Sequence, residues 1–435
     1  MSDQTTTDFP RIYRTVQPEL GYEGFIVVDS ALNGRAAGGI RMSPHVAQDE
    51  VAALARVMTL KFGFANLYYG GAKAGIRLTA TPTPAQRRAV MQSFGREFRE
   101  VIGSGLYRPG EDIGTDPGDV GCVMESAGCR GAKSDGAGSG RYTAMTAVAA
   151  VEVLCREVGI ALRGATVAVE GFGKVGAEAA RQLARLGARP VAVSTLEGAV
   201  FRPRGLDLER LRDLKDRHGD ACVLHYRDGE PMSIEQMLGL DVDVLVLAGK
   251  PHAVRGDNVD HVRAAVIVPG GNLSITGEAE EALIRRGRII FPDFVANCGG
   301  VLGLTWHGMG LSDERIVRLV TTDFARKLEY LVAASTRTRS VREVAETIAA
   351  RNILRMRGEV DPRPARARGR WAERWRRASP HWIATQLFRI FATKRRLMPS
   401  TMAAYAKAVF WADRPVYRHM AYDSSSRSRP SARPS

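Results

Sequence analysis

Residues 165–176 read ATVAVEGFGKVG, and this stretch decides the fold class. Its first half is a short apolar run of the kind that forms a buried strand. Its second half has the pattern G-x-G-x-x-G, with glycines at 171, 173 and 176. Apolar residues then recur at helical spacing as far as Leu186, and residues 190–194 (PVAVS) form a second strand-like run. The stretch therefore predicts one βαβ unit of a parallel sheet.

The glycine turn of this unit predicts a dinucleotide site. Glycines permit a tight turn and let a pyrophosphate approach the backbone at the start of the helix. A glycine motif alone is a weak signal in a chain with 45 glycines, but here a strand precedes it and a helix follows it. The residues expected to contact the cofactor at this turn are Gly171, Gly173, Lys174, Val175 and Gly176.

The end of the second strand bears on the choice between NAD and NADP. An acidic residue usually stands there and bonds the ribose hydroxyls, whereas this strand ends at Ser194 and Thr195. Arg202 and Arg204 follow soon after, and arginines near a strand end without an acid tolerate a 2′-phosphate. Either cofactor is therefore expected beside Thr195. In the other interpretation, both arginines simply face solvent.

Lys73 lies in the segment YGGAKAGI, residues 69–76, and Lys61 precedes it by twelve residues. An ammonium group partly removed from water and placed near a second cation loses proton affinity, so such a lysine is suited to acid–base chemistry near neutral pH. Asp112 lies in residues 107–115 (YRPGEDIGT), which predict a turn that holds a carboxylate in place. Lys73 and Asp112 are therefore the candidate catalytic residues.

Four segments in a fixed order carry a resemblance: residues 38–76, the Asp112 turn, the glycine turn, and residues 292–301 (PDFVANCGGV). Over roughly residues 20 to 355, the chain resembles the glutamate/leucine/phenylalanine/valine dehydrogenase family. The resemblance implies reversible oxidative deamination of an L-amino acid to a 2-oxo acid and ammonia, with hydride passing to NAD or NADP. It also implies a homo-oligomer.

The resemblance assigns a role to each matching residue. Lys73 would activate water and polarise the substrate carbon, Asp112 would carry protons to and from the amino nitrogen, and Lys61 would bind the α-carboxylate. These roles agree with the chemistry, because a carboxylate needs a fixed cation and imine chemistry needs a weak base with a proton carrier. The remaining implied contacts are Gly38, Gly39, Asn297 and Gly300 around the substrate, and Thr143 and Asn272 at the cofactor.

Several of these residues have an ordinary structural alternative. Lys61 closes the apolar helical stretch 51–60 and could be a helix-end lysine favoured by the macrodipole. Asp112 could be a turn-forming aspartate, and Asn272 could be a left-handed turn residue after its two glycines.

Two departures from the glutamate-using branch of the family concern the substrate side chain. That branch has a lysine directly before the first Gly-Gly pair, where this chain has Ala37. It also has a serine four residues after the second glycine of Asn-x-Gly-Gly, where this chain has Leu304. A buried γ-carboxylate would lose both partners, so the pattern favours an apolar L-amino acid such as leucine, valine or phenylalanine. Glutamate is the alternative, with Arg35, Arg41 or another residue not identified from the sequence binding its side-chain carboxylate.

Further short apolar runs at 242–247, 265–268 and 289–291 alternate with helical stretches, as a parallel sheet covered on both faces requires. We therefore expect an α/β protein with its catalytic groups and its cofactor turn in two domains. The expected regions are a substrate-binding and dimerisation domain over 10–140, a Rossmann domain over 141–310, helices packing back across the cleft over 311–357, and a basic, partly disordered extension over 358–435.

The C-terminal region carries most of the positive charge. Residues 341–435 hold 21 Lys/Arg against 7 Asp/Glu, a net +14 that leaves 15 − 14 = +1 for the rest of the chain. Four of the five tryptophans, at 371, 375, 382 and 411, lie there among arginines. The pattern fits docking on the protein itself, a partner protein or an anionic membrane surface, with nucleic acid less favoured.

Other features of the sequence limit the classes of protein to which the chain can belong. No run of 18 apolar residues exists, the polar start is unlike a secretory signal, and five scattered cysteines predict reduced thiols in a cytoplasm. The eight histidines show no metal-ligand spacing, so no metal is inferred. A rival from another class is a non-catalytic nucleotide-binding or scaffold protein with a basic tail, although such a protein has no need of Lys73 and Asp112.

Overall fold

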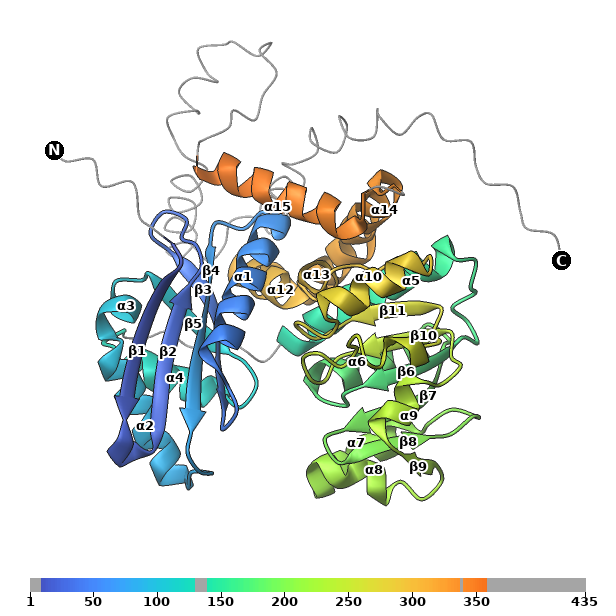
Figure 1. Cartoon of the computed structure of the whole chain (residues 1–435), viewed down its shortest axis with the longest axis horizontal. Coiled ribbons are helices and arrows are strands. Elements are labelled where there is room, and N and C mark those ends of the chain that lie inside the picture. The colour runs from blue at the N-terminus through green and yellow to red at the C-terminus, as the bar shows by residue number, and fades with distance from the viewer. Residues whose placement is uncertain (1–8, 130–138, 337–338, 358–435) are drawn as a thin grey trace, which may run out of the picture. The chain divides into compact units, whose positions relative to one another are not determined.

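The computed structural model describes residues 9–129, 139–336 and 339–357 (Figure 1). The predicted extension at 358–435, with its tryptophans, lies outside the described residues. The described chain forms two compact units. The first holds residues 9–129, 139, 301–311 and 349–357, and the second holds residues 140–300, 312–336 and 339–348.

The first unit is built on a five-stranded sheet with the order β1-β2-β4-β3-β5. β1 (Arg11–Gln17) and β4 (Gly70–Leu78) each pair antiparallel with β2 (Tyr22–Val28). β3 (Ala36–Ser43) pairs parallel with β4 on one side and with β5 (Tyr107–Glu111) on the other. The three parallel strands therefore present their carboxyl ends at one edge of the sheet.

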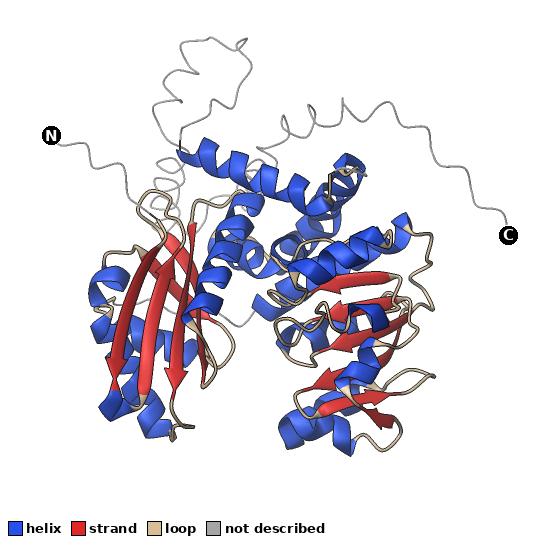
Figure 2. Ribbon diagram, viewed as in Figure 1, coloured by secondary structure: helices blue, strands red, loops and turns tan. Residues whose placement is uncertain are grey.

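Helices cover both faces of this sheet (Figure 2). α1 (Gln48–Ala65) packs on the face that carries Phe25 and Val27. On the other face, α2 (Pro84–Glu97), α3 (Arg99–Gly103) and α4 (Pro117–Ser126) enclose the larger apolar core. Local sequence sets the helix starts, because α2 and α4 each begin with a capping box followed by proline at the first helical position.

The C-terminal half of α15 (Val341–Arg357) also belongs to the first unit and lies against α1. The Asn352 side-chain amide donates to the Gly63 carbonyl at 2.9 Å. A Cβ at Gly63 would lie 2.7 Å from the Ala349 carbonyl oxygen, so only glycine permits this close helix contact.

The second unit has a six-stranded sheet with the order β11-β10-β6-β7-β8-β9. Its parallel core consists of β6 (Thr166–Glu170), β7 (Arg189–Thr195), β10 (Val244–Leu247) and β11 (Val266–Pro269). β8 (Gly198–Phe201) and β9 (Glu230–Met232) extend one edge antiparallel. α6 (Lys174–Arg185) connects β6 to β7, which confirms the predicted βαβ unit and the α/β fold with a Rossmann-type domain.

The described chain contains further α-helices and one π-helix. They are α5 (Ser139–Glu157), α7 (Leu208–His218), α8 (Cys222–His225), α9 (Ile234–Leu238), α10 (Gly277–Arg285), α11 (Asp293–Ala296), α12 (Gly299–Gly308), α13 (Asp313–Arg318), the π-helical η5 (Leu319–Phe324) and α14 (Ala325–Ala334). None of the helices within the described ranges is both long and apolar enough to cross a bilayer.

The predicted strand at 289–291 is wrong. Ile290 and Phe291 are buried, as an inner strand would be, but the run joins neither of the two sheets in the described chain. It is confined between Gly287, which has a left-handed φ of 78° after α10, and Pro292, which begins the turn into α11. Apolar content therefore reports burial here, not sheet pairing.

Two local expectations around the candidate catalytic residues also change. The predicted turn over 107–115 is confined to its second half, where the Thr115 amide donates to the Asp112 carbonyl at 3.1 Å. Residues 107–111 form β5, and Pro109 is tolerated because β5 is an edge strand. α1 continues to Ala65, so the interpretation of Lys61 as a helix-end lysine is wrong. Lys61 lies within the helix and is 5% exposed.

Candidate active site

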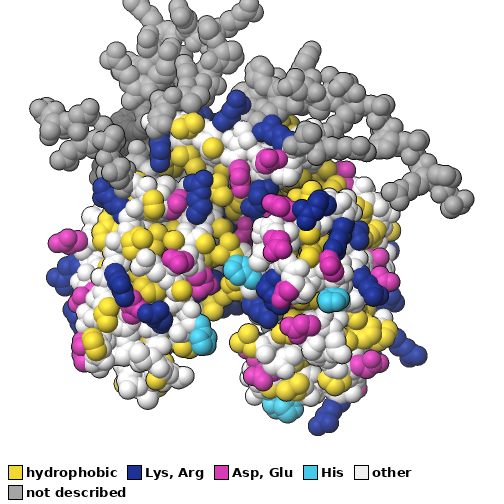
Figure 3. Space-filling model, viewed as in Figure 1, with side chains coloured by type: hydrophobic (Ala, Val, Ile, Leu, Met, Phe, Trp, Pro, Cys, Tyr) yellow, Lys and Arg dark blue, Asp and Glu magenta, His cyan; other side chains and the backbone are white. Residues whose placement is uncertain are grey.

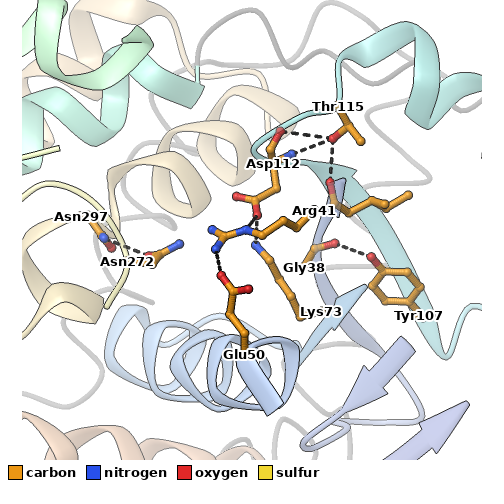
Figure 4. Close-up of polar contacts among 10 residues, drawn as sticks. Gly38, Arg41, Glu50, Lys73, Tyr107, Asp112, Thr115, Asn272 and Asn297 are labelled. Carbon is orange, nitrogen blue, oxygen red and sulfur yellow. Dashed lines mark hydrogen bonds and ion pairs between the residues drawn. The ribbon is translucent and has the colours of Figure 1, made fainter. Parts of the chain in front are cut away.

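The first unit brings Lys73 and Asp112 together, as their candidate roles require (Figure 4). Lys73 lies in the middle of β4, and Asp112 directly follows β5. The Lys73 ammonium group, Nζ, lies 3.0 Å from Asp112 Oδ2. The backbone amide of Asp112 donates to Thr115 Oγ1 at 3.0 Å, and the Thr115 hydroxyl donates to the Ile40 carbonyl at 2.7 Å. The loop that carries Asp112 is thus tied to the neighbouring strand β3.

Two further charged residues complete this ionic cluster: Glu50, which was not predicted as a site residue, and Arg41, which was named only as a possible partner of a substrate γ-carboxylate. Arg41 on β3 donates through Nε to Asp112 Oδ2 at 2.9 Å, and its Nη1 donates to Glu50 in the first turn of α1. The Arg41 side chain is 6% exposed. An arginine in an otherwise apolar strand needs a buried anionic partner, and this is the signal by which the sequence could have indicated the contact.

Burial and charge shift the two candidate catalytic groups. Removal from water lowers the pKa of Lys73, and the nearby Arg41 charge lowers it further, against the opposing effect of Asp112. Burial alone would raise the pKa of Asp112, but the Lys73 and Arg41 charges and their hydrogen bonds outweigh burial and lower it. The result is a carboxylate that stays ionised beside an amine with reduced proton affinity.

The glycine pair before Arg41 is required by close strand packing. A Cβ at Gly38 would lie 1.7 Å from the Ala72 carbonyl oxygen, and a Cβ at Gly39 would lie 2.7 Å from the Asp112 Cβ. The buried Tyr107 hydroxyl donates to the Gly38 carbonyl at 2.9 Å. Burial raises the pKa of Tyr107 well above its usual value, so the hydroxyl remains a donor.

The other predicted substrate residues are distributed over both units. Ala37 lies on β3 and is partly buried, and Leu304 lies on α12 and is 38% exposed. Asn297 and Gly300 flank the start of α12 in the second unit. A contact of these residues with the substrate stays a prediction.

The glycine turn in the second unit has the geometry that a pyrophosphate site needs. Gly171 has a φ of 91°, and a Cβ there would lie 2.3 Å from the Gly249 Cα. A Cβ at Gly176 would lie 1.8 Å from the Gly171 carbonyl oxygen, so this glycine lets α6 pack on the turn. A Cβ at Gly173, by contrast, would meet nothing within 4 Å. Lys174 and Val175 then open α6, and the N-terminus of a helix favours an anion. These residues fit a dinucleotide.

The end of β7, the second strand of this unit, contains no acidic side chain. Thr195 is the last residue of β7, and its hydroxyl donates to the Asp220 carbonyl at 2.6 Å. The Arg202 amide donates to the Val191 carbonyl at 2.8 Å, so Arg202 lies at the opposite end of the β7–β8 hairpin. The expectation that Arg202 lies near the strand end is therefore wrong.

Asn272 and Asn297 lie together in the second unit (Figure 4). The Asn297 amide donates to Asn272 Oδ1 at 2.9 Å, and within the described chain the buried Asn297 Oδ1 has no hydrogen-bond partner. The left-handed residue of this turn is Leu273, with a φ of 54°, and not Asn272 as one interpretation held. Asp293 accepts from the Leu273 amide at 2.7 Å and holds this turn.

Thr143 lies on α5 in the same unit, where the next turn of the helix anchors α12. The Gly299 amide donates to Thr146 Oγ1 at 3.0 Å, and a Cβ at Gly299 would lie 1.8 Å from the Tyr142 carbonyl oxygen. This contact fixes the start of α12, and with it Gly300, against the helix that carries Thr143.

Comparison with known proteins agrees with this geometry. The sequence profile described as Glutamate/Leucine/Phenylalanine/Valine dehydrogenase matches residues 137–356. The profile of the Glu/Leu/Phe/Val dehydrogenase dimerisation domain matches residues 13–128. Together these matches cover both described units.

Individual relatives are moderately similar. The chain is 36% identical over 301 residues to the glutamate dehydrogenase of Thermotoga maritima, which covers 64% of this chain and 70% of the relative. It is 31% identical over 313 residues to the NADP-specific glutamate dehydrogenase of Saccharolobus shibatae, covering 67% and 73%. A structure of the hetero-hexameric glutamate dehydrogenase from Thermus thermophilus, in its Leu-bound form, is 27% identical with a TM-score of 0.67, covering 78% of this chain and 84% of that one.

A Rossmann-type unit with a glycine turn suited to a pyrophosphate, together with a unit that carries a buried lysine–aspartate pair, is the arrangement expected of a nicotinamide-dependent dehydrogenase. The chain belongs to the Glu/Leu/Phe/Val dehydrogenase family. It is an NAD- or NADP-dependent amino acid dehydrogenase, an oxidoreductase acting on CH–NH₂ donors. The predicted family and reaction class are confirmed, and the rival of a non-catalytic scaffold is not supported.

Proposed function

We propose that the protein catalyses the reversible oxidative deamination of L-glutamate to the 2-oxo acid and ammonia. The observation that carries the reaction is the buried Lys73–Asp112 pair, which joins a base of lowered proton affinity to an ionised proton carrier. The substrate follows from the relatives described above, which are all named glutamate dehydrogenases. These names support the glutamate alternative better than the predicted apolar substrate.

Each residue then has a defined task. Lys61 binds the α-carboxylate, Lys73 activates the water that attacks the imine carbon, and Asp112 moves a proton to or from the amino nitrogen. Bound NAD or NADP supplies the hydride acceptor. The buried Asn297 Oδ1 is a polar atom within the described chain that a ligand would satisfy, which supports its placement beside the bound molecules.

An apolar amino acid is the second candidate, and two residues favour it. Ala37 and Leu304 present a methyl and an isobutyl group where the glutamate-using branch has a lysine and a serine. Arg41 is already bonded through Nε and Nη1, and Arg35 is exposed, so neither resembles a preformed site for a second carboxylate. Leucine, valine and phenylalanine therefore belong in the first substrate panel.

The test is NADH and NADPH formation by the purified protein with L-glutamate and with these apolar amino acids. We expect Lys73→Ala to lower kcat by about 10²–10⁴-fold, the usual contribution of a positioned acid–base group. Lys215→Ala is the matched control, because Lys215 is a partly exposed lysine that pairs with Asp220 in the second unit. Absence of NAD(P)H formation with L-glutamate would contradict the proposed substrate, and its absence with all the amino acids of the panel would contradict the proposed reaction. Unchanged turnover in Lys73→Ala would contradict the role of Lys73.

We also propose a homo-oligomer. Support comes from the match of residues 13–128 to a region described as a dimerisation domain, and from the hetero-hexameric assembly of the Thermus thermophilus glutamate dehydrogenase. Light scattering on the protein as it elutes from a size-exclusion column measures the mass of the assembly directly. A mass equal to one chain at micromolar concentration would refute the proposed homo-oligomer.

A further inference from the structure

A second ion pair, Arg41–Glu50, lies beside the Lys73–Asp112 pair (Figure 4). Arg41 comes from β3 and Glu50 from the first turn of α1, so three elements besides the Asp112 loop contribute charge to one buried cluster. The side chains of Arg41 and Lys73 are 6% and 3% exposed. Charges this deeply buried require fixed partners, because an unpaired one would cost several kcal/mol.

The two cations bind the same carboxylate oxygen. Asp112 Oδ2 accepts from Arg41 Nε at 2.9 Å and lies 3.0 Å from Lys73 Nζ. Both of these contacts are to Oδ2, and the backbone amide of Asp112 itself donates to Thr115 Oγ1. The carboxylate is therefore held by one oxygen, and its other oxygen is available for a proton partner.

Glu50 keeps Arg41 in this position. Its carboxylate accepts from Arg41 Nη1, and it stands in the first turn of α1, where the helix dipole favours an anion. Arg41 thus directs one N–H donor at each of the two carboxylates, and these two contacts fix the orientation of its planar guanidinium group. A lysine at position 41 would keep the charge but could not reproduce the two-ended contact.

We propose that Arg41, anchored by Glu50, is a positioning residue that holds the Asp112 carboxylate by Oδ2 and leaves Oδ1 for the amino nitrogen of the substrate. The proposal rests on the proposed amino acid deamination and extends it to the Arg41–Glu50 pair. Arg41 acts through Asp112 and Lys73 and does not itself bind the reacting atoms.

The charges of Arg41 and Glu50 shift the pKa of Lys73 in opposite directions. The charged groups facing Lys73 are Asp112 after β5, Arg41 on β3 and Glu50 on α1. The Arg41 charge lowers the pKa of Lys73, whereas the Glu50 charge raises it. Deamination needs neutral Lys73, so its rate falls as the pH falls through the pKa of that amine. Removing the Arg41 charge moves this acid limb to higher pH, and removing the Glu50 charge moves it to lower pH.

The experiment compares Arg41→Met, Arg41→Lys and Glu50→Gln with the wild type in kcat, KM and the pH profile of kcat/KM. We expect Arg41→Met to lower kcat by about 10²-fold or more with a smaller change in KM, and Arg41→Lys to recover part of the loss. The acid limbs of Arg41→Met and Glu50→Gln should shift in opposite directions. Arg77→Met is the matched control, since Arg77 near the end of β4 pairs with Glu23 and its side chain is 47% exposed.

Two results would overturn the proposal. One is a kcat of Arg41→Met within about twofold of the wild type, and the other is a shift of both acid limbs in the same direction. Thermal unfolding of each variant beside Arg77→Met separates loss of folding from loss of positioning.

A second readout does not depend on turnover. Competitive acetylation of the wild type and the variants across pH, with mass spectrometry of the Lys73 peptide, reports the titration of this amine directly. The same opposite shifts are expected there. If the wild type forms no NAD(P)H with any amino acid, the proposed function fails. The labelling still decides whether Arg41 and Glu50 act on Lys73, and unchanged labelling profiles in both variants would refute the arrangement.

Discussion

Lys73 has reduced proton affinity because burial and the neighbouring Arg41 act in the same direction. Asp112 opposes them, but its single bridging oxygen is shared between the two cations. The pair therefore differs from a simple salt bridge, in which each partner would strengthen the charge of the other. Deamination needs a lysine that can lose its proton and an aspartate that is ionised at the start of the reaction, and the pair meets both requirements.

At the same residue scale, we expect substrate choice to depend on positions 37 and 304. Ala37→Lys combined with Leu304→Ser adds a cation and a hydroxyl for a γ-carboxylate. The double variant should raise the glutamate-to-leucine ratio of kcat/KM by at least about tenfold, as expected for a site that gains polar partners. Steady-state kinetics on both substrates measures the ratio. Ala37→Met with Leu304→Ser is the control, because methionine has similar length without the charge; an equal gain in that control would rule out the ionic explanation.

At the scale of the elements, the turn between β6 and α6 contains glycines that are needed for two different reasons. Gly176 is needed for the fold, since its Cβ would overlap the Gly171 carbonyl, whereas the space around Gly173 is open. Gly173 has a φ of −95°, which other residues also adopt. A glycine with neither a backbone nor a packing reason to be glycine is best explained by a ligand that approaches it.

We therefore expect Gly173→Ala and Gly176→Ala to fail in different ways. Gly173→Ala should change the unfolding free energy by less than about 1 kcal/mol but weaken NAD(H) binding. Gly176→Ala should destabilise the protein by about 1–3 kcal/mol through overpacking, even without cofactor. Thermal unfolding without cofactor and calorimetric titration with NADH measure the two effects. Equal cofactor affinity in Gly173→Ala and the wild type would contradict a pyrophosphate at this turn.

The β7–β8 hairpin bears on the cofactor phosphate. Val191, whose carbonyl accepts from the Arg202 amide, lies four residues before the end of β7 at Thr195. At about 3.3 Å per residue this is roughly 13 Å along the strand. Arg202 also donates to the Tyr226 hydroxyl at 3.5 Å, which directs it away from the strand end.

Arg202→Ala should accordingly leave the ratio of KM for NADP to KM for NAD unchanged within about twofold, because the side chain does not reach the ribose end of the site. Measurement of both KM values with the same amino acid tests this. A selective rise of at least about tenfold in KM for NADP would show that the arginine binds the 2′-phosphate after all.

At the scale of the whole molecule, charge is unevenly distributed along the chain. Residues 358–435 hold 17 Lys/Arg and 5 Asp/Glu, a net +12, so the preceding 357 residues carry 15 − 12 = +3. Figure 3 shows Lys and Arg interspersed with Asp and Glu on the visible face of the described chain. The basicity of the protein is therefore a property of the C-terminal extension and not of the enzyme body.

A chain that ends at Arg357 should retain kcat and KM within about twofold of the full-length protein. All the proposed site residues precede this point, and the family match ends at residue 356. Activity of the shortened protein, with its elution from a cation-exchange column as the check on lost charge, tests this. Loss of turnover in a shortened protein that still unfolds cooperatively would show that the extension contributes to catalysis.

The sequence was sufficient wherever the signal is local. The β6–α6–β7 unit, its glycine turn and the Lys73 and Asp112 candidates follow from residues that are neighbours in the chain, because turn geometry and strand or helix periodicity are set over a few residues. The same local reasoning misjudged residues 289–291, and it extended the Asp112 turn over residues 107–111, which form β5. Apolar content and turn residues do not specify which backbone a segment pairs with.

The tertiary structure alone decided which distant residues share a site. Arg41 meets Asp112 across 71 positions, and Asn272 meets Asn297 across 25, through strand order and helix packing that no short window contains. The position of Arg202 was likewise decided by the register of the β7–β8 hairpin. Contacts and burial depend on long-range pairing, and proton affinity depends on both. The sequence therefore indicated which groups could react, and the fold decided which charges surround them.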